Sequence, residues 1–121
     1  MARSITKLSP DQNGLLPLTP AVFYVLFALA DGEKHGYAVM QQVVVLSDGQ
    51  FHMGPGTLYG TIQRLLDLSL IEEIANHDEP EGRRRYYRLT GAGRALLQTE
   101  LSHMDAILRL AQQKKLVPRN A

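Results

Sequence analysis

The sequence of 121 residues predicts a mainly α-helical domain with one small β-hairpin. Three observations support this prediction. Apolar residues recur at helical spacing between residues 56 and 67, two short strand-like runs follow at 70–74 and 83–89, and a second long helical pattern begins at residue 91. This order of helix, hairpin and helix is typical of a winged helix-turn-helix that continues into a long C-terminal helix.

The amino-acid composition limits the classes of protein to which this chain can belong. With 45% apolar and 21% charged residues, the chain predicts one small domain whose modest core a partner subunit can complete. The absence of cysteine excludes disulfides, thiolate zinc sites and cysteine nucleophiles. The longest apolar run, residues 21–30, is about half of the roughly 20 residues that cross a bilayer, and the N-terminus carries no secretion signal, so we expect a cytoplasmic protein.

The N-terminal part predicts an arm and a first helix. Residues 1–17 mix serine, proline, glycine and charges without periodicity, which predicts a mobile arm. Thr19 and Pro20 suit the N-cap and first position of a helix, which we expect to end near Asp31 and Gly32. This helix is apolar all round, and one domain core cannot use every face. A second subunit is the simplest cover for the remainder.

Two further helices follow. The second is expected over residues 36–46, although its run of three valines at 43–45 has poor helix propensity. The third is expected over residues 56–67, after the turn at 53–56, with an apolar face made of Leu58, Ile62, Leu65 and Leu66. Its opposite face is polar, almost uncharged and rich in small residues, which allows a helix to lie close to base edges.

The hairpin divides its charges unevenly. A strand at 70–74, a loop at 76–82 and a returning strand at 83–89 are expected, and Thr90 can cap the next helix. Formal net charge is only +1, which is low for a protein that neutralises phosphates. Arginines cluster on the second strand, whereas acids lie on the first strand and at the loop tip.

The last helix is expected from Gly91 to about Leu116, where Pro118 ends it, and would be about 39 Å long at the usual rise per residue. Its apolar residues alternate at spacings of four and three, which is the seam of a coiled-coil-like contact: Leu97, Leu101, Met104, Leu108 and Ala111. Such a seam extends beyond a small core, so it requires a partner.

These residues resemble the PadR family of transcriptional regulators, and within it the shorter members with a single C-terminal helix. The resemblance spans roughly residues 18–110. Its strongest pieces are His35-Gly36-Tyr37, then Gly56-Thr57-Leu58-Tyr59 with Arg64-Leu65, and residues 82–90 (GRRRYYRLT) followed by Gly93. The resemblance implies a dimer formed through the first and last helices, binding to operator DNA, and often a response to small aromatic or drug-like molecules.

The chain departs from the family pattern at three points. Gly60 stands where the family often has proline, and Ser69 replaces the usual glycine in the turn before the first strand. Tryptophan is absent, which argues against the flat aromatic-stacking ligand site of some short members. Met104, near the middle of the last helix, can instead line a softer apolar cavity.

The candidate DNA-binding residues fall into three groups. On the third helix, Arg64 would favour guanine and Gln63 adenine in the major groove, and Arg83, Arg84 and Arg85 of the wing suit phosphate or the minor groove. Tyr37 lies at a helix start, where free backbone amides attract phosphate. The third-helix group as a whole consists of Thr57, Tyr59, Gly60, Thr61, Gln63 and Arg64.

Each group also has a purely structural interpretation. The third-helix face can be an ordinary solvated surface, and Tyr37 can be a packed tyrosine at a helix entry. The wing arginines can pair across the hairpin with Glu72, Glu73 or the loop acids. Tyr86 and Tyr87 are expected to pack, because adjacent strand residues cannot both face nucleic acid.

An apolar cluster is expected where the first and last helices meet, either as an effector pocket at the dimer centre or as filled dimer core. Of the four histidines, only His103 has a partner at helical metal-ligand spacing, Glu100, so no metal site and no cofactor are predicted. No catalytic motif is present, and the chain is not expected to be an enzyme. The members of the apolar cluster are Phe23, Phe27, Leu97, Leu101, Met104 and Leu108.

The sequence therefore predicts a cytoplasmic, dimeric, sequence-specific DNA-binding regulator, a repressor that occludes its operator and is released by a small hydrophobic or aromatic effector. Its partners are double-stranded operator DNA and a second copy of itself, with no membrane. The predicted divisions are an arm over 1–17, a DNA-binding domain over 18–90, a dimerisation helix over 91–117 and a tail over 118–121. The alternative is a winged-helix protein–protein interaction module, favoured by the near-neutral charge and by the acidic wing tip of Asp78, Glu79 and Glu81.

Overall fold

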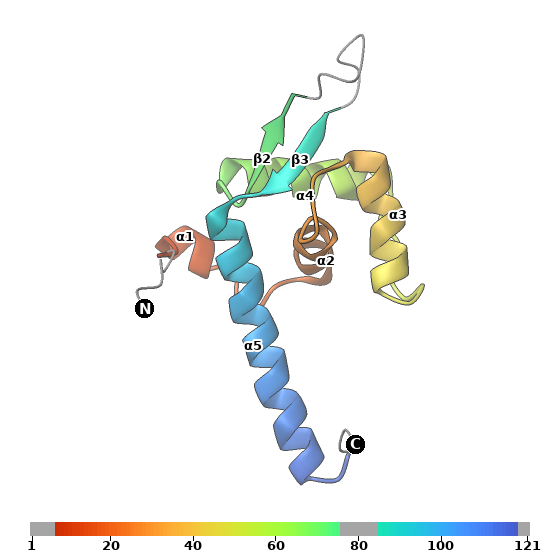
Figure 1. The fold of residues 1–121 in the computed structure, drawn as a ribbon, viewed down its shortest axis with the longest axis vertical. Coiled ribbons are helices and arrows are strands. Elements are labelled where there is room, and N and C mark those ends of the chain that lie inside the picture. Colours follow the sequence, from red (N-terminus) through yellow and green to blue (C-terminus); the bar gives the residue numbers. More distant parts are fainter. Residues whose placement is uncertain (1–6, 76–84, 119–121) are drawn as a thin grey trace.

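The computed structural model describes residues 7–75 and 85–118, which form the predicted winged helix-turn-helix with a long C-terminal helix (Figure 1). Helix α3 has the predicted bounds, whereas α2 ends three residues before Asp31 and α5 ends at Gln113, which makes α5 about 35 Å long. The elements are α1 (Pro10–Asn13), α2 (Pro20–Ala28), β1 (Lys34–His35), α3 (Gly36–Leu46), α4 (Pro55–Asp67), β2 (Ile71–Ile74), β3 (Tyr86–Leu89) and α5 (Gly91–Gln113).

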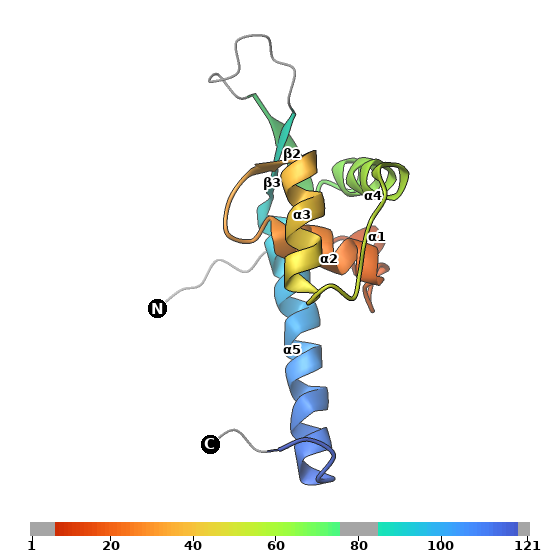
Figure 2. The same cartoon turned by 90° about the vertical axis from the view of Figure 1, so that its right-hand side faces the viewer.

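Helix α2 lies at the centre of the domain, where it packs against α3, α4 and α5 (Figures 1 and 2). Thr19 caps it by accepting a hydrogen bond from the Val22 amide, as its sequence predicted. Val25 and Leu26 are fully buried, and Phe23 and Phe27 keep partial exposure beside the core. The chain's own elements therefore cover more of α2 than its all-round apolar sequence suggested.

The sheet has three strands in the order β1-β3-β2, all antiparallel, rather than the two expected. The added strand β1 pairs Lys34 with Tyr87 and His35 with Tyr86. Because β1 has only two residues, it carries no alternation that a sequence pattern could reveal. Its effect is to attach the entry of α3 to the base of the wing.

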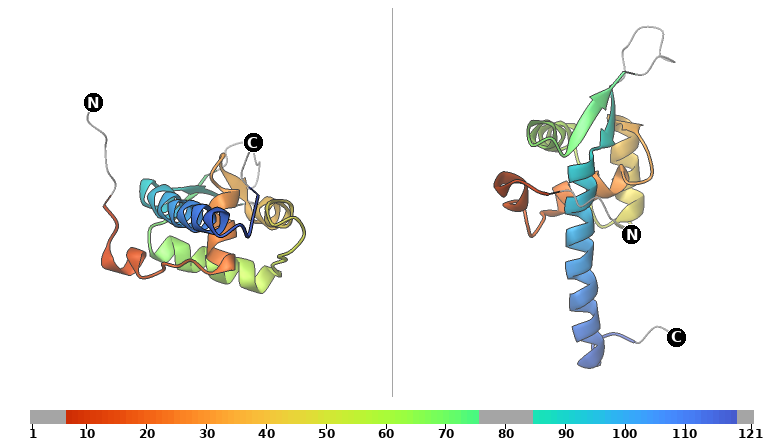
Figure 3. Two further views of the ribbon diagram at one scale, coloured as in Figure 1. Left: turned by 90° about the horizontal axis from the view of Figure 1, so that it is seen from below. Right: turned by 60° about the vertical axis from the view of Figure 1, so that its left-hand side comes forward.

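A short helix lies within the segment that was predicted as a mobile arm. Ser9 caps α1 through a reciprocal capping box with Gln12. The Gln12 side chain also donates to the carbonyl oxygen of Leu68, at 2.8 Å, at the end of α4. Leu15 and Leu16 pack against the core, so the described part of this segment is joined to the domain, on the same side of α5 as α4 (Figure 3).

Three helices end in the same left-handed turn. In α4, Ser69 has φ of 57°, and the Leu70 amide donates to the Leu65 carbonyl at 2.9 Å, which is a Schellman motif. Asp48 after α3 and Lys115 after α5 occupy the equivalent position. Ser69 thus adopts the backbone conformation for which glycine would be expected, and the chain turns directly into β2.

Helix α5 is supported only along its first half. Arg94 donates to the Ala30 carbonyl at 3.0 Å, and Leu96 and Leu97 are buried in the core. Beyond Glu100 the helix extends away from the domain, and residues 101–110 are all exposed (Figures 1 and 2). Within residues 7–75 and 85–118, no helix is both long and apolar enough to span a membrane.

Candidate nucleic-acid interface

The start of α4 is an open helix N-terminus. Gly54 is the N-cap and makes no side-chain cap, and Pro55 occupies the first helical position. The next two residues, Gly56 and Thr57, are exposed. The first backbone N–H groups of a helix have no partner within it, so this end suits a phosphate group.

One row of α4 residues points directly away from the core. Leu58, Ile62 and Leu65 are buried on the inner side. The outer row consists of Gly56, Gly60, Gln63 and Asp67, spaced by four, three and four residues, and all four are exposed.

The two glycines of this row have no structural purpose within the subunit. A Cβ atom built on Gly56 or Gly60 would meet nothing within 4 Å, and neither residue has a positive φ. Glycine inside a helix costs roughly 0.5–1 kcal/mol relative to alanine. The result is an outer row without side chains over the first two turns of α4, which another molecule can approach closely.

The remaining predicted α4 residues differ in their surroundings. Arg64 is exposed and Thr61 is partly buried. Tyr59 is half-exposed, and its ring lies against Gly36 at the start of α3, where an added Cβ would be 2.5 Å from the hydroxyl oxygen. Tyr59 therefore forms a contact between α3 and α4 in addition to its exposed edge.

The start of α3 is less open than predicted. His35 caps it, because its Nδ1 atom accepts a hydrogen bond from the Ala38 amide at 3.2 Å. The side chain therefore occupies one of the amides that were expected to be free for phosphate. Tyr37, in the same turn, is 59% exposed and is not the packed tyrosine of the structural interpretation.

The described part of the wing contains one cross-strand pair of the alternative interpretation, between Arg85 and Glu73, and a second pair, between Arg88 and Glu72, that was not predicted. Arg88 Nε lies 2.6 Å from Glu72 Oε1, and Arg85 Nη1 lies 3.8 Å from Glu73 Oε1. Both pairs are exposed, so each contributes little to stability. Arg83, Arg84 and the acidic loop tip lie outside the described residues.

The two wing tyrosines pack, as predicted. Tyr87 is buried, and this burial, with Glu73 and Tyr59 nearby, raises the pKa of its hydroxyl above the ordinary value of tyrosine. Tyr86 is partly buried and makes an edge-to-face contact with His35, with ring centroids 5.5 Å apart.

The predicted cluster on α2 and α5 is divided between core and surface. Leu97 is buried within the subunit, so it offers no surface to a partner. Leu101, Met104 and Leu108 are exposed along the seam. Ile107, also exposed, lies beside the seam and widens this apolar surface, whereas the exposed Leu110 lies on nearly the opposite face of the helix.

The Glu100 carboxylate is buried beside this surface. It accepts a hydrogen bond from the Leu18 amide, and its Oε1 atom lies 3.7 Å from Nδ1 of His103. Among the described residues, no group of three or more histidine or acidic side chains could hold a metal ion.

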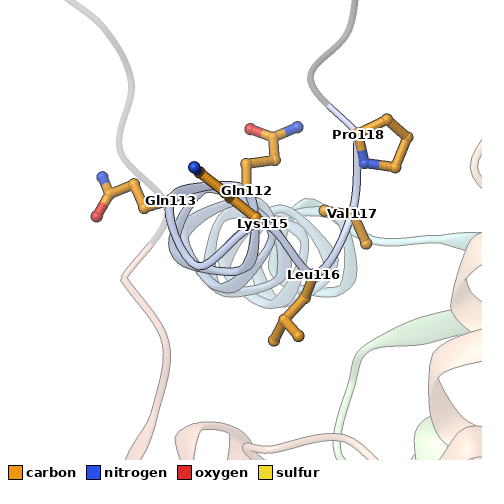
Figure 4. Close-up of a pocket in the computed structure, with 6 residues that line it drawn as sticks. All are labelled: Gln112, Gln113, Lys115, Leu116, Val117 and Pro118. Carbon is orange, nitrogen blue, oxygen red and sulfur yellow. The ribbon is translucent and has the colours of Figure 1, made fainter.

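An open hollow lies at the C-terminal end of α5, where the chain turns back (Figure 4). It lies well beyond Met104 along α5 and is not the predicted effector pocket. No sequence pattern pointed to it, because it arises from the turn after Gln113. Its lining consists of Gln112, Gln113, Lys115, Leu116, Val117 and Pro118.

One contact on the outer row of α4 was missed by sequence reasoning. The Gln63 side-chain amide donates to Oδ1 of Asp67 at 2.9 Å. The spacing of four residues on one helix face was the available signal.

Residues 25–99 match the transcriptional regulator PadR-like family, from α2 through the sheet into α5. The chain belongs to the PadR-like family of transcriptional regulators. This membership confirms the predicted family and the prediction that the chain is not an enzyme.

Two relatives extend the match. The chain is 36% identical over 87 residues to the transcriptional regulator Rv3488 of Mycobacterium tuberculosis, covering 71% of this chain and 77% of that protein. It is 42% identical over 84 residues to an uncharacterized 37.1 kDa protein in transposon TN4556 of Streptomyces fradiae. That second match covers 69% of this chain but only 23% of the transposon protein.

Solved structures share the fold. A PadR family transcription regulator from Clostridium difficile R20291 superposes with a TM-score of 0.66 at 24% identity, covering 78% of this chain and 97% of the other. Bacillus subtilis PadR in complex with operator DNA gives a TM-score of 0.59 at 20% identity, covering 66% and 45%. The PadR-like winged helix, with its long C-terminal helix, is therefore the fold of this chain.

Proposed function

We propose that this PadR-like regulator binds operator DNA as a homodimer, with α4 of each subunit in the major groove. The observation that carries the proposal is the outer row of α4, where Gly56 and Gly60 reduce helix stability without serving any contact inside the subunit. A partner that approaches the helix backbone closely explains both glycines. The complex of Bacillus subtilis PadR with operator DNA supports DNA as that partner.

The charges of α4 and the wing favour specific over non-specific DNA binding. The open N-terminus of α4 supplies attraction for phosphate, and Arg83 and Arg84 add to it from the wing. Glu72 and Glu73 offset Arg88 and Arg85. With a formal net charge of +1, the chain should bind unrelated DNA weakly and depend on base contacts for affinity.

The exposed half of α5 is the proposed dimer contact. The domain leaves Leu101, Met104 and Leu108 exposed, and the added width from Ile107 suits packing against more than one helix of the partner. A two-fold axis near these residues would place the two α4 helices about 34 Å apart, which matches successive major grooves of a pseudo-palindrome.

Repression by occlusion of the promoter follows from such a complex in the cytoplasm. An apolar effector that binds between α2 and α5, near Phe23, Phe27 and Met104, would relieve this repression by moving the two subunits apart. A ligand regulates only through its differential affinity for the free and DNA-bound shapes, and a hundredfold relief requires about 2.7 kcal/mol of coupling.

The test is titration of a fluorescent duplex from the chain's own upstream region, beside an unrelated duplex, over a range of salt. The proposal expects tighter binding to the upstream duplex, and a larger loss there than on unrelated DNA when Gly60→Ala adds a methyl group to the outer row. Equal affinity for both duplexes would contradict it and would favour a protein–protein module.

A further inference from the structure

The outermost part of α4 carries a hydrogen-bonded pair after its two glycines. Gln63 Nε2 donates to Asp67 Oδ1 at 2.9 Å, and both residues are exposed. Because Gly56 and Gly60 have no side chains, Gln63 is the first side chain that protrudes from the outer row. Its amide is therefore well placed to contact whatever lies against this row.

The partner of Gln63 determines which way its amide faces. A glutamine amide has one acceptor oxygen and a nitrogen with two donors, and a free side chain can present them in either order. An ionised carboxylate only accepts hydrogen bonds. Asp67 therefore holds the nitrogen end and excludes the reversed amide. This leaves the oxygen and one N–H of Gln63 available for a second partner.

Those two free groups match one base edge. In the major groove adenine offers N7 as an acceptor and N6–H as a donor, and glutamine can contact both atoms at once. We propose that Asp67 is a positioning residue that fixes the Gln63 amide for reading adenine. This inference rests on the proposed function, since it requires α4 in the major groove.

The charge of Asp67 makes a role in general affinity implausible. A carboxylate on a DNA-facing row repels phosphate, and among the described residues no lysine or arginine pairs with Asp67. The outer row thus carries a negative charge at a position where a neutral residue would increase the affinity for any DNA. A contribution to base discrimination accounts for this position.

Two substitutions separate the hydrogen bond from the charge. Asp67→Asn removes the charge and keeps a hydrogen-bond partner for Gln63, but its amide can hold Gln63 in either orientation, whereas Asp67→Ala removes both the charge and the partner. Dissociation constants would be measured for the upstream duplex, for duplexes with single A·T pairs of each half-site changed to G·C, and for an unrelated duplex. Thermal unfolding checks that each variant folds.

Both variants should bind unrelated DNA more tightly than the parent, and by a similar factor. Asp67→Asn should show a preference between those of the parent and of Asp67→Ala, because its amide holds Gln63 but allows both orientations. Asp67→Ala should lose about fivefold or more of its preference at one A·T pair, the lower range of what a bidentate contact provides. In a Gln63→Ala background, Asp67→Ala should cause no further loss at that pair.

Two results would overturn the positioning role while leaving the proposed function intact. One is a parent protein that prefers upstream DNA and an Asp67→Ala variant with an unchanged base preference. The other is a further loss of preference when Asp67→Ala is added to the Gln63→Ala background, which would assign the effect to the charge of Asp67 and not to its bond with Gln63. A parent that does not prefer upstream DNA would instead overturn the proposed function and this inference together.

Discussion

Gly93 lies directly against the backbone of Leu70, so that a Cβ atom built on Gly93 would be 1.9 Å from the Leu70 carbonyl oxygen. The same carbonyl accepts a hydrogen bond from the Thr90 amide at 3.1 Å, and the Thr90 hydroxyl donates to the Ser69 carbonyl at 2.7 Å. These contacts fix the start of α5 to the turn between α4 and β2. The angle between α4, the proposed DNA-binding helix, and α5, the proposed dimer helix, is therefore fixed at this junction.

Gly93→Ala should strongly destabilise the domain. The clash is with backbone, which cannot move as a side chain can, and we expect a loss of about 3 kcal/mol or more in the free energy of unfolding. Gly60→Ala is the matched control, because it adds the same methyl group to open space within a helix and should stabilise by roughly 0.5–1 kcal/mol. Urea unfolding measures both, and equal effects would refute the backbone contact.

Ser69→Gly should stabilise the protein. Ser69 has φ of 57°, a conformation that costs a non-glycine residue of the order of 1 kcal/mol. Its side chain is exposed, so little is lost with it. We expect a gain of about 0.5–1 kcal/mol in urea unfolding, whereas Ser69→Ala should give none. A loss of stability in Ser69→Gly would show that the serine side chain matters more than the strain.

Charge introduced on the exposed half of α5 should dissociate the dimer. Leu101→Asp or Met104→Asp would bury an unpaired carboxylate if this surface is an interface, at a cost of several kcal/mol. Gln98→Asp is the control, because Gln98 is exposed on the half of α5 that lies beside the domain. Light scattering should give monomers for the first two variants and a dimer for the third. Unchanged assembly in all three would place the interface elsewhere.

Wing and α4 should contribute different parts of DNA binding. Arg84→Ala should weaken specific and unrelated DNA similarly and reduce the salt slope by about one unit, as expected for one phosphate contact. Arg64→Ala should cost roughly 1–3 kcal/mol mainly on the specific site. Arg88→Ala is the comparison within the wing, since Arg88 is paired with Glu72 at 2.6 Å. Unaltered affinity and slope in Arg83→Ala, Arg84→Ala and Arg85→Ala would make the wing arginines structural.

The helices could be predicted because their signals are local. Thr19 and Thr90 accept hydrogen bonds at the starts of α2 and α5, and the spacing of Leu58, Ile62 and Leu65 gives the buried face of α4. Capping and periodicity act within a few residues, so they can be read without knowledge of the tertiary structure.

The remaining features depend on contacts between distant residues. Strand β1 exists because β3 lies beside it, and α1 is attached to the domain by a bond from Gln12 to Leu68. Leu97 belongs to the seam by spacing but to the core by packing. At the candidate site, Gly60 and Arg64 are exposed as helical spacing predicted, whereas Thr61, expected on the same face, is partly buried. The packing of Tyr59 on Gly36 had no signal in the sequence.

Hydroxyl-radical footprinting of the chain's own upstream DNA tests the central claim most directly, because it reports both subunits and the spacing of their α4 helices. The account predicts protection in two patches related by two-fold symmetry, with centres about 10 base pairs apart, on a pseudo-palindromic sequence. Leu101→Asp should weaken both patches together. A single unpaired patch, or uniform protection without sequence preference, would contradict a dimer that reads operator DNA through α4.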